Sequence, residues 1–316
     1  MSEIISLIPR ADGVTEGLYC TDNAAGKLIH SKDLGGLDEA DDVLIVQHGL
    51  PGVEWRKAAE EKARALVQNR QDVAVILGIP MGIKENDKNL ANKTLGVGED
   101  LARIKAEFPD LFDKDFTLAG YLHGLSRLAK SARGDIREDC RLHLAGQSFG
   151  SLALLSALRE MRGNGIAPPD SASFLAPFVS ADRYAIQGTD EYALSMSNPH
   201  SKMSEVGRSA KLNNIYKECH DHYRVTEHVD LQLLKSHDNL FSKEFYDVVD
   251  DLHEFCRKTI VQIIRGEHDS DISDRHSALL KGRMDVHSEL MLPESGHDLE
   301  SLGFAQLLPD NLPGEK

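Results

Sequence analysis

The sequence lacks long hydrophobic runs and clusters of positive charge. No window approaches the about 18 consecutive apolar residues that a membrane-spanning helix needs. The 36 Lys and Arg residues stand against 51 Asp and Glu residues, and the resulting formal charge of -15 repels phosphate backbones and anionic lipid headgroups. Lys and Arg form no run with interleaved aromatics. We therefore expect neither a nucleic acid nor a membrane as a partner.

Cysteine is also scarce. Its four copies are scattered singly in a chain of 316 residues, which is too large to depend on disulfide bonds: Cys20, Cys140, Cys219 and Cys256. Residues 1–12 contain no basic stretch followed by a long apolar run and a small-residue cleavage site. These features predict reduced cysteines and a cytoplasmic protein.

Motifs that hold cofactors or metals are missing too. Gly49-Leu-Pro-Gly52 lacks the third glycine and the helix-opening context of a dinucleotide-binding turn. Cys219-His-Asp-His222, with His228, matches no established zinc spacing, and a polar surface segment is the commoner explanation. The carboxylates from Asp269 to Asp274 lack the glycine and the distal Glu of a calcium loop. We expect no cofactor and no bound metal.

What is present is a regular alternation of buried strands and helices. Five short apolar runs predict strands of a parallel sheet: Val43 to Val46, Val73 to Leu77, Leu142 to Ala145, Phe174 to Phe178 and Ile260 to Ile264. Helical spacing occupies Glu54 to Gln68, Glu99 to Ala106, Phe116 to Ala132 and Ser151 to Met161. An antiparallel hairpin is expected from Thr15 to Leu34, and a further strand from about His287 to Leu292. The pattern predicts a doubly wound α/β sheet with helices on both faces.

One segment interrupts this alternation. Residues 180–256 are polar, rich in His and charge, and contain no buried-strand run. The spacing of apolar residues from Leu231 to Cys256 is helical. We predict a helical lid at 180–256, inserted into a core formed by 1–179 and 257–316.

The strongest chemical signal is a strand, a Gly-Gln-Ser-Phe-Gly turn and a helix in immediate succession. A nucleophile on such a sharp turn has strained backbone angles, and the flanking Gly146 and Gly150 relieve the crowding. The turn exposes the Ser148 hydroxyl. It also places the Phe149 amide at a helix N-terminus, where it could stabilise an oxyanion.

A serine nucleophile needs a base and an orienting acid, and candidates for both follow in the chain. Asp269 comes just after a predicted strand, and His297 follows the next one. His297 would take the Ser148 proton while Asp269 holds the imidazolium. Other residues compete for these roles, since Glu267, Asp271 and Asp274 share the acid loop, and His268 and His287 are the other histidines nearby.

Four segments together resemble the α/β-hydrolase superfamily: His48-Gly49 after a strand, Gly146 to Gly150, Gly266 to Asp269, and Gly296-His297. The resemblance covers roughly residues 40–180 and 257–305. It implies an eight-stranded, mostly parallel sheet, with Ser148, Asp269 and His297 as the catalytic triad. It also implies that the amides of Leu50 and Phe149 form the oxyanion hole, and that His48 is structural.

These features predict a serine hydrolase that cleaves an ester, thioester or amide of a small molecule through an acyl-enzyme. Two other classes stay open. One is a carbon-carbon bond hydrolase or lyase that uses the same triad. The other is a non-catalytic ligand-binding protein with this fold, although the presence of all three triad residues weighs against it.

Overall fold

The computed structural model describes residues 2–21, 24–49, 53–79, 118–179, 252–269, 274–282 and 284–309. Several predictions fall outside these ranges: the Leu50 amide, the helix from Glu99 to Ala106, Asp271, the Cys219 to His228 segment and residues 180–251 of the predicted lid. The division into core and lid therefore stays a prediction.

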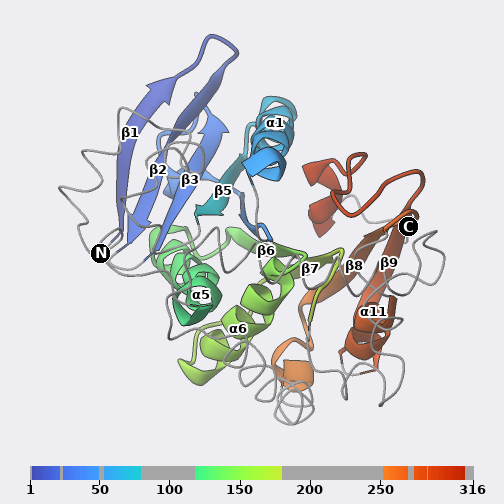
Figure 1. Ribbon diagram of the computed structural model, residues 1–316. Helices are drawn as coiled ribbons and strands as arrows, with labels where there is room; N and C mark the ends of the chain where they lie inside the picture. The colour runs from blue at the N-terminus through green and yellow to red at the C-terminus, as the bar shows by residue number, and fades with distance from the viewer. Residues whose placement is uncertain are drawn as a thin grey trace, which may run out of the picture.

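The described chain is built on a mostly parallel sheet of nine strands in the order β1-β2-β3-β5-β4-β6-β7-β8-β9 (Figure 1). The strands are β1 Glu3–Pro9, β2 Val14–Thr21, β3 Ala24–Ser31, β4 Asp42–Gln47, β5 Val73–Ile79, β6 Arg141–Gln147, β7 Ser171–Leu175, β8 Ile260–Gly266 and β9 Val286–Leu292. Strands β4 to β9 run parallel to one another, while β1, β2 and β3 form an antiparallel meander that joins the sheet through β5. The predicted hairpin from Thr15 to Leu34 is confirmed as β2 and β3.

Two details of the predicted sheet need correction. Within the described residues the sheet has nine strands instead of the predicted eight, because the short apolar segment at Glu3–Pro9 pairs with β2 as an edge strand. The strand predicted from Phe174 to Phe178 is β7, Ser171–Leu175. The prediction missed the first three residues of the strand because two of them, Ser171 and Ser173, are polar although they are buried. The strand ends before Ala176, whose φ is 40°.

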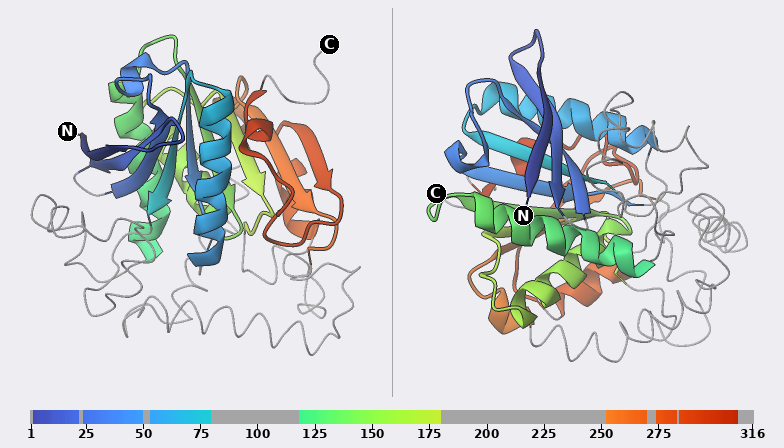
Figure 2. Two further views of the ribbon diagram at one scale, coloured as in Figure 1. Left: turned by 90° about the horizontal axis from the view of Figure 1, so that it is seen from above. Right: turned by 90° about the vertical axis from the view of Figure 1, so that its left-hand side faces the viewer.

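Helices cover both faces of the sheet (Figure 2). Helix α1, Val53–Asn69, lies on one face and buries Ala59, Ala63, Leu66 and Val67, which recur at helical spacing. Helices α5, Leu118–Asp135, and α6, Gly150–Gly163, pack on the other face with α11, Asp274–Lys281. Among the described residues, no helix is both long and apolar enough to cross a bilayer.

This topology determines where a site can form. After β4 the chain adds β5 on one side and then β6 on the other, so the winding direction reverses beside β4. In parallel sheets, ligands bind at the carboxyl ends of the strands near such a reversal. The turns after Gln47 and Gln147, which end β4 and β6, lie at this point.

The opposite, amino edge of the same strands carries a buried ionic network. Asp42, at the start of β4, is fully buried and accepts hydrogen bonds from Arg70, Arg141 and His143. His143 Nδ1 lies 2.9 Å from the hydroxyl of Ser171. Burial alone would raise the pKa of Asp42, but the hydrogen bonds from His143 and Arg141 outweigh it and hold the pKa at about 2.

Asp42 should therefore contribute stability that is present near neutral pH and is lost as the pH falls through 3.8 towards 2. We predict that Asp42→Asn lowers the free energy of unfolding by about 2 kcal/mol or more, because it removes the buried carboxylate with which Arg70 and Arg141 pair. In urea titrations the difference in the free energy of unfolding between wild type and Asp42→Asn should decrease by about 1 kcal/mol when the pH is lowered from about 6 to about 3.

Asp72→Asn is the matched control. Asp72 also accepts from Arg70, at 2.8 Å, but its side chain is 36% exposed whereas that of Asp42 is 0% exposed, and solvent-exposed pairs contribute about 1 kcal/mol or less. Equal losses in the two variants would contradict the assignment of Asp42 as the centre of the network.

Candidate active site

Ser148 lies in a strained turn between β6 and α6. Its φ of 51° is in the left-handed region, which a residue with a side chain adopts only when its surroundings hold it there. Three backbone hydrogen bonds do so: Ser148 N donates to Leu175 O at 2.8 Å, and Ser148 O accepts from Phe178 N at 3.2 Å and Ser151 N at 2.9 Å. The turn is thus fixed by its own helix, by the last residue of β7 and by the segment that follows β7.

Glycines let neighbouring backbones approach this turn closely. A Cβ at Gly146 would lie 2.4 Å from the Gly150 carbonyl oxygen, and one at Gly150 would lie 2.3 Å from the carbonyl oxygen of Gln47. A Cβ at Gly49 would lie 2.9 Å from Ser148 Cβ. The turn after β4 therefore packs directly against the serine, as the sequence predicts.

That same turn was predicted to supply an oxyanion donor. His48 is buried, and its Nδ1 lies 2.7 Å from the carbonyl oxygen of Gly49, within its own turn. This contact fits the structural role expected of His48. Leu50 lies outside the described residues, so its amide stays a prediction.

The predicted acid and base meet at the ends of β8 and β9. His297 Nδ1 lies 3.2 Å from Asp269 Oδ2. A carboxylate can only accept, so Nδ1 carries the proton and Nε2 is left as the basic nitrogen. Asp269 is 1% exposed and His297 is 19% exposed, so the acid lies beneath the imidazole while the ring reaches solvent.

The two loops that carry this pair are joined through their backbones. His268 N donates to Ser295 O at 2.9 Å, and Glu267 N donates to Leu292 O at 3.0 Å. A Cβ at Gly266 would lie 2.1 Å from the carbonyl oxygen of Gly296. The close approach of the loops, which brings Asp269 to His297, requires a glycine there.

The competing residues in these loops have other surroundings. Glu267 and His268 are exposed, and the Glu267 carboxylate accepts from the backbone of Glu294. His287 Nδ1 accepts from Val261 N within the sheet. Asp269 is therefore the acid that contacts His297, while Asp271 lies outside the described residues.

Two polar side chains that the sequence did not single out hold the His297 loop. Gln147, which immediately precedes the nucleophile, directs Nε2 at the carbonyl oxygen of His297, 3.4 Å away. From α1, Lys62 Nζ donates to the carbonyl oxygen of Leu299 at 2.8 Å. The loop thus contacts the serine turn from one side and α1 from the other, and the contact between His297 Nε2 and the Ser148 hydroxyl stays a prediction.

Nothing in the described residues assembles a metal centre, because no three His, Cys, Asp or Glu side chains gather there closely enough to hold an ion. The polar groups at the carboxyl edge of the sheet are a serine in a strained turn and, in contact with each other, a buried carboxylate and an imidazole. This set can perform proton transfer and nucleophilic attack.

Comparison with known proteins identifies the fold. The sequence matches no protein-family model and no curated protein. Carboxyl esterase 2 from the mycorrhizal fungus Tuber melanosporum superposes with a TM-score of 0.53, at 11% identity over 98% of this chain and 82% of that one. The structure of EstE5-PMSF gives a TM-score of 0.50, at 14% identity over 96% of this chain and 82% of the other. At these identities the likeness establishes the fold alone, which is the α/β-hydrolase fold.

Replacement of Gly266 by Ala should damage the site by separating the acid and histidine loops. The added Cβ would meet backbone atoms, which cannot rotate away, so we expect a loss of about 2 kcal/mol or more in the free energy of unfolding. Urea unfolding measures this loss.

Gly134→Ala, in the last turn of α5, is the control. An added Cβ there meets no atom within 4 Å, and alanine favours a helix by about 0.5 kcal/mol or more. Gly266→Ala unfolding at the same urea concentration as Gly134→Ala would refute the close approach of the two loops.

Proposed function

We propose that this chain is a serine hydrolase that cleaves an ester, thioester or amide of a small molecule through an acyl-enzyme. The observation that carries the proposal is the Asp269–His297 pair, at 3.2 Å, joined through Gln147 to the strained turn of Ser148. Acyl transfer needs a nucleophile, a base and an acid that orients the base. The serine in the left-handed turn, the partly exposed imidazole and the buried carboxylate match these three needs.

In the proposed reaction the Ser148 hydroxyl attacks the substrate carbonyl carbon, and His297 Nε2 accepts its proton. The buried Asp269 stabilises the imidazolium that results. When the tetrahedral intermediate collapses, the bond to the leaving group breaks and His297 returns the proton to that group. Water, deprotonated by the same nitrogen, then attacks the acyl-serine. The bond between the acyl carbon and Ser148 Oγ breaks, the acid is released, and His297 returns the proton to Oγ.

The negative oxygen of the intermediate needs donors that are already oriented. The Phe149 amide stands just before α6, where the helix dipole favours negative charge. The Leu50 amide is the proposed second donor, and the close approach of the preceding residue, Gly49, to Ser148 supports this proposal.

Ester-type substrates are favoured, because activated acyl groups need the least assistance to the leaving group. The similarity to the fold of a carboxyl esterase agrees with this choice. The remaining features of the proposal are specificity set by the 180–256 lid, no cofactor, and neither nucleic acid nor membrane as a partner.

The proposed compartment is the cytoplasm, with thiols kept reduced. Burial raises the pKa of Cys140 to about 11 and that of Cys256 to about 12, so both thiols stay protonated and unreactive at neutral pH. Alkylation of protein denatured directly from cells, without reductant, should modify all four cysteines. Detection of a disulfide in that material would contradict the proposed compartment.

The central test is covalent labelling of Ser148. A fluorophosphonate probe should label the wild-type protein, and peptide mapping should find the probe on this serine. Ser148→Ala should abolish labelling and reduce hydrolysis of p-nitrophenyl esters by at least about 10³-fold. Ser156→Ala, a half-buried serine on α6, should behave as the wild type.

The remaining classes give different results. Absence of labelling and turnover in folded wild-type protein would refute the hydrolase and favour a binding protein. Labelling of Ser148 with turnover of a 1,3-diketone but of no ester, thioester or amide would favour carbon-carbon bond cleavage.

A further inference from the structure

His276 is a buried histidine that takes no part in the proposed reaction. It lies in the first turn of α11, the helix that follows the Asp269 loop, and it is fully buried. Its Nδ1 accepts a hydrogen bond of 3.1 Å from the backbone amide of Val179. The contact joins the acid side of the site to a segment 97 residues earlier in the chain.

The segment that His276 holds is also the one that supports the nucleophile. After β7, Ala176 has a φ of 40°, and its amide donates to Ile264 O at 2.8 Å. Two residues later, the amide of Phe178 donates to the carbonyl oxygen of Ser148. Val179 is the next residue, so the hydrogen bond to His276 fixes the far side of this second strained turn.

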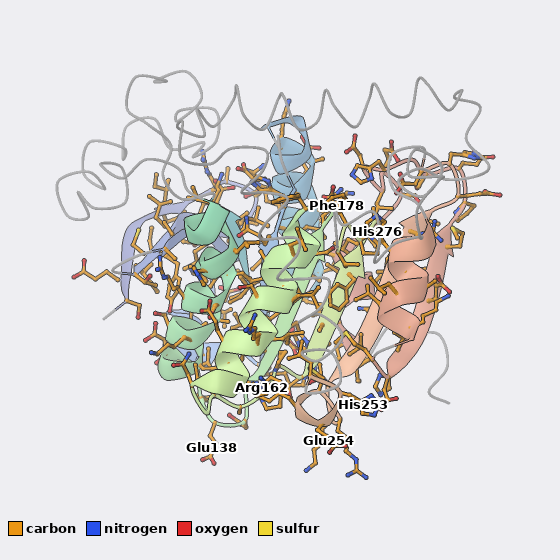
Figure 3. The ribbon with its side chains drawn as sticks, turned by 60° about the horizontal axis from the view of Figure 1, so that its bottom comes forward. Glu138, Arg162, Phe178, His253, Glu254 and His276 are labelled. Atoms are coloured by element: carbon orange, nitrogen blue, oxygen red, sulfur yellow. The ribbon has the colours of Figure 1, made fainter. Side chains whose placement is uncertain are left out.

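A second contact links His276 to the segment after β7 through aromatic rings. The rings of Phe178 and His276 have centroids 5.1 Å apart, and both are labelled in Figure 3. Phe178 in turn stacks on Phe149, at 5.6 Å and an interplanar angle of 24°. Phe149 carries the proposed oxyanion amide, so His276 is linked to the serine turn in two indirect ways, through the backbone at Phe178 and Val179 and through the ring of Phe178.

The protonation state of His276 suits an acceptor. Burial lowers its pKa to about 3; nearby Asp269 opposes this shift, and Arg265 adds to it. The ring is therefore neutral at physiological pH. Because Nδ1 accepts from Val179, the proton is on Nε2, which has no hydrogen-bond partner among the described residues. The unsatisfied Nε2–H group carries a cost that an apolar ring, such as that of phenylalanine, would not have. The advantage of a histidine at this position is therefore the hydrogen bond that Nδ1 accepts.

We propose that His276 is a positioning residue for acyl transfer: its neutral imidazole anchors the 176–179 segment and so holds Ser148 and the Phe149 amide in their reactive geometry. This inference rests on the proposed serine hydrolase function. It assigns His276 no contact with the substrate and no proton transfer.

Two substitutions separate the anchor from simple packing. His276→Phe keeps a stacking ring but removes the acceptor, whereas His276→Asn loses the ring but places Oδ1 near the position of Nδ1. With an ester substrate, His276→Phe should lower kcat by about 10- to 100-fold while KM changes by less than about threefold. Phosphonylation of Ser148 should slow in parallel, and His276→Asn should recover at least about a third of the lost kcat.

A second measurement covers folding and does not depend on activity. Amide hydrogen exchange at Phe178 and Val179 should accelerate at least about tenfold in His276→Phe and should stay near the wild-type rate in His276→Asn. The near-ultraviolet circular dichroism of His276→Phe should be that of the native protein, which shows that the variant is folded. Exchange at β5 serves as the internal reference.

The outcomes separate this inference from the proposed function. Failure of the wild-type protein to label or turn over would refute the hydrolase, and hydrogen exchange would then still decide whether His276 anchors the segment. In an active enzyme, an unchanged kcat in a folded His276→Phe protein, or equal losses in both variants, would overturn the positioning role.

Discussion

The rest of the site depends on the backbone of Ser148, which is held in the left-handed region. That conformation costs about 1–3 kcal/mol for a residue with a side chain, and it persists because the surroundings determine it from several directions. Leu175, the last residue of β7, accepts from the Ser148 amide, and Phe178, just after β7, donates to the Ser148 carbonyl. The glycines at 49, 146 and 150 let three backbones converge on the turn. The favourable packing of the rest of the sheet thus offsets the conformational cost of holding the Ser148 hydroxyl at the edge of the sheet.

Asp269 and His297 are also held in place by close contacts between neighbouring segments of the backbone. Parallel strands end at a common edge, so loops after β8 and β9 start close together, and Gly266 allows them to touch. The burial of Asp269 under the partly exposed His297 then sets the orientation of the imidazole. Gln147 and Lys62 fix the histidine loop against the serine turn and α1. Precision at the site arises from contacts between loops and from a rigid sheet beneath them.

The sequence predicted the strands, the nucleophile turn and the pairing of Asp269 with His297, because each leaves a local signal: a short branched run, a glycine pattern, or a polar residue just after a strand. It missed β1 and misplaced the start of β7, where buried serines conceal the strand. The roles of Gln147, Lys62 and His276 were not predictable in this way. Their partners lie 97 to 237 residues away in the chain, and no local pattern encodes such contacts.

The two ends of the sheet show why residue types alone do not define a site. At the amino edge, Asp42, His143 and Ser171 lie in hydrogen-bonding contact, the same three residue types as the proposed triad. All three are at most 1% exposed, the serine lies within a regular strand, and Asp42 is bound by two arginines, so the group links strands and reaches no substrate. At the carboxyl edge the serine leaves its strand in a strained turn and the imidazole reaches solvent. Backbone strain and access, rather than the presence of serine, histidine and aspartate, therefore distinguish a nucleophile from a structural hydrogen bond.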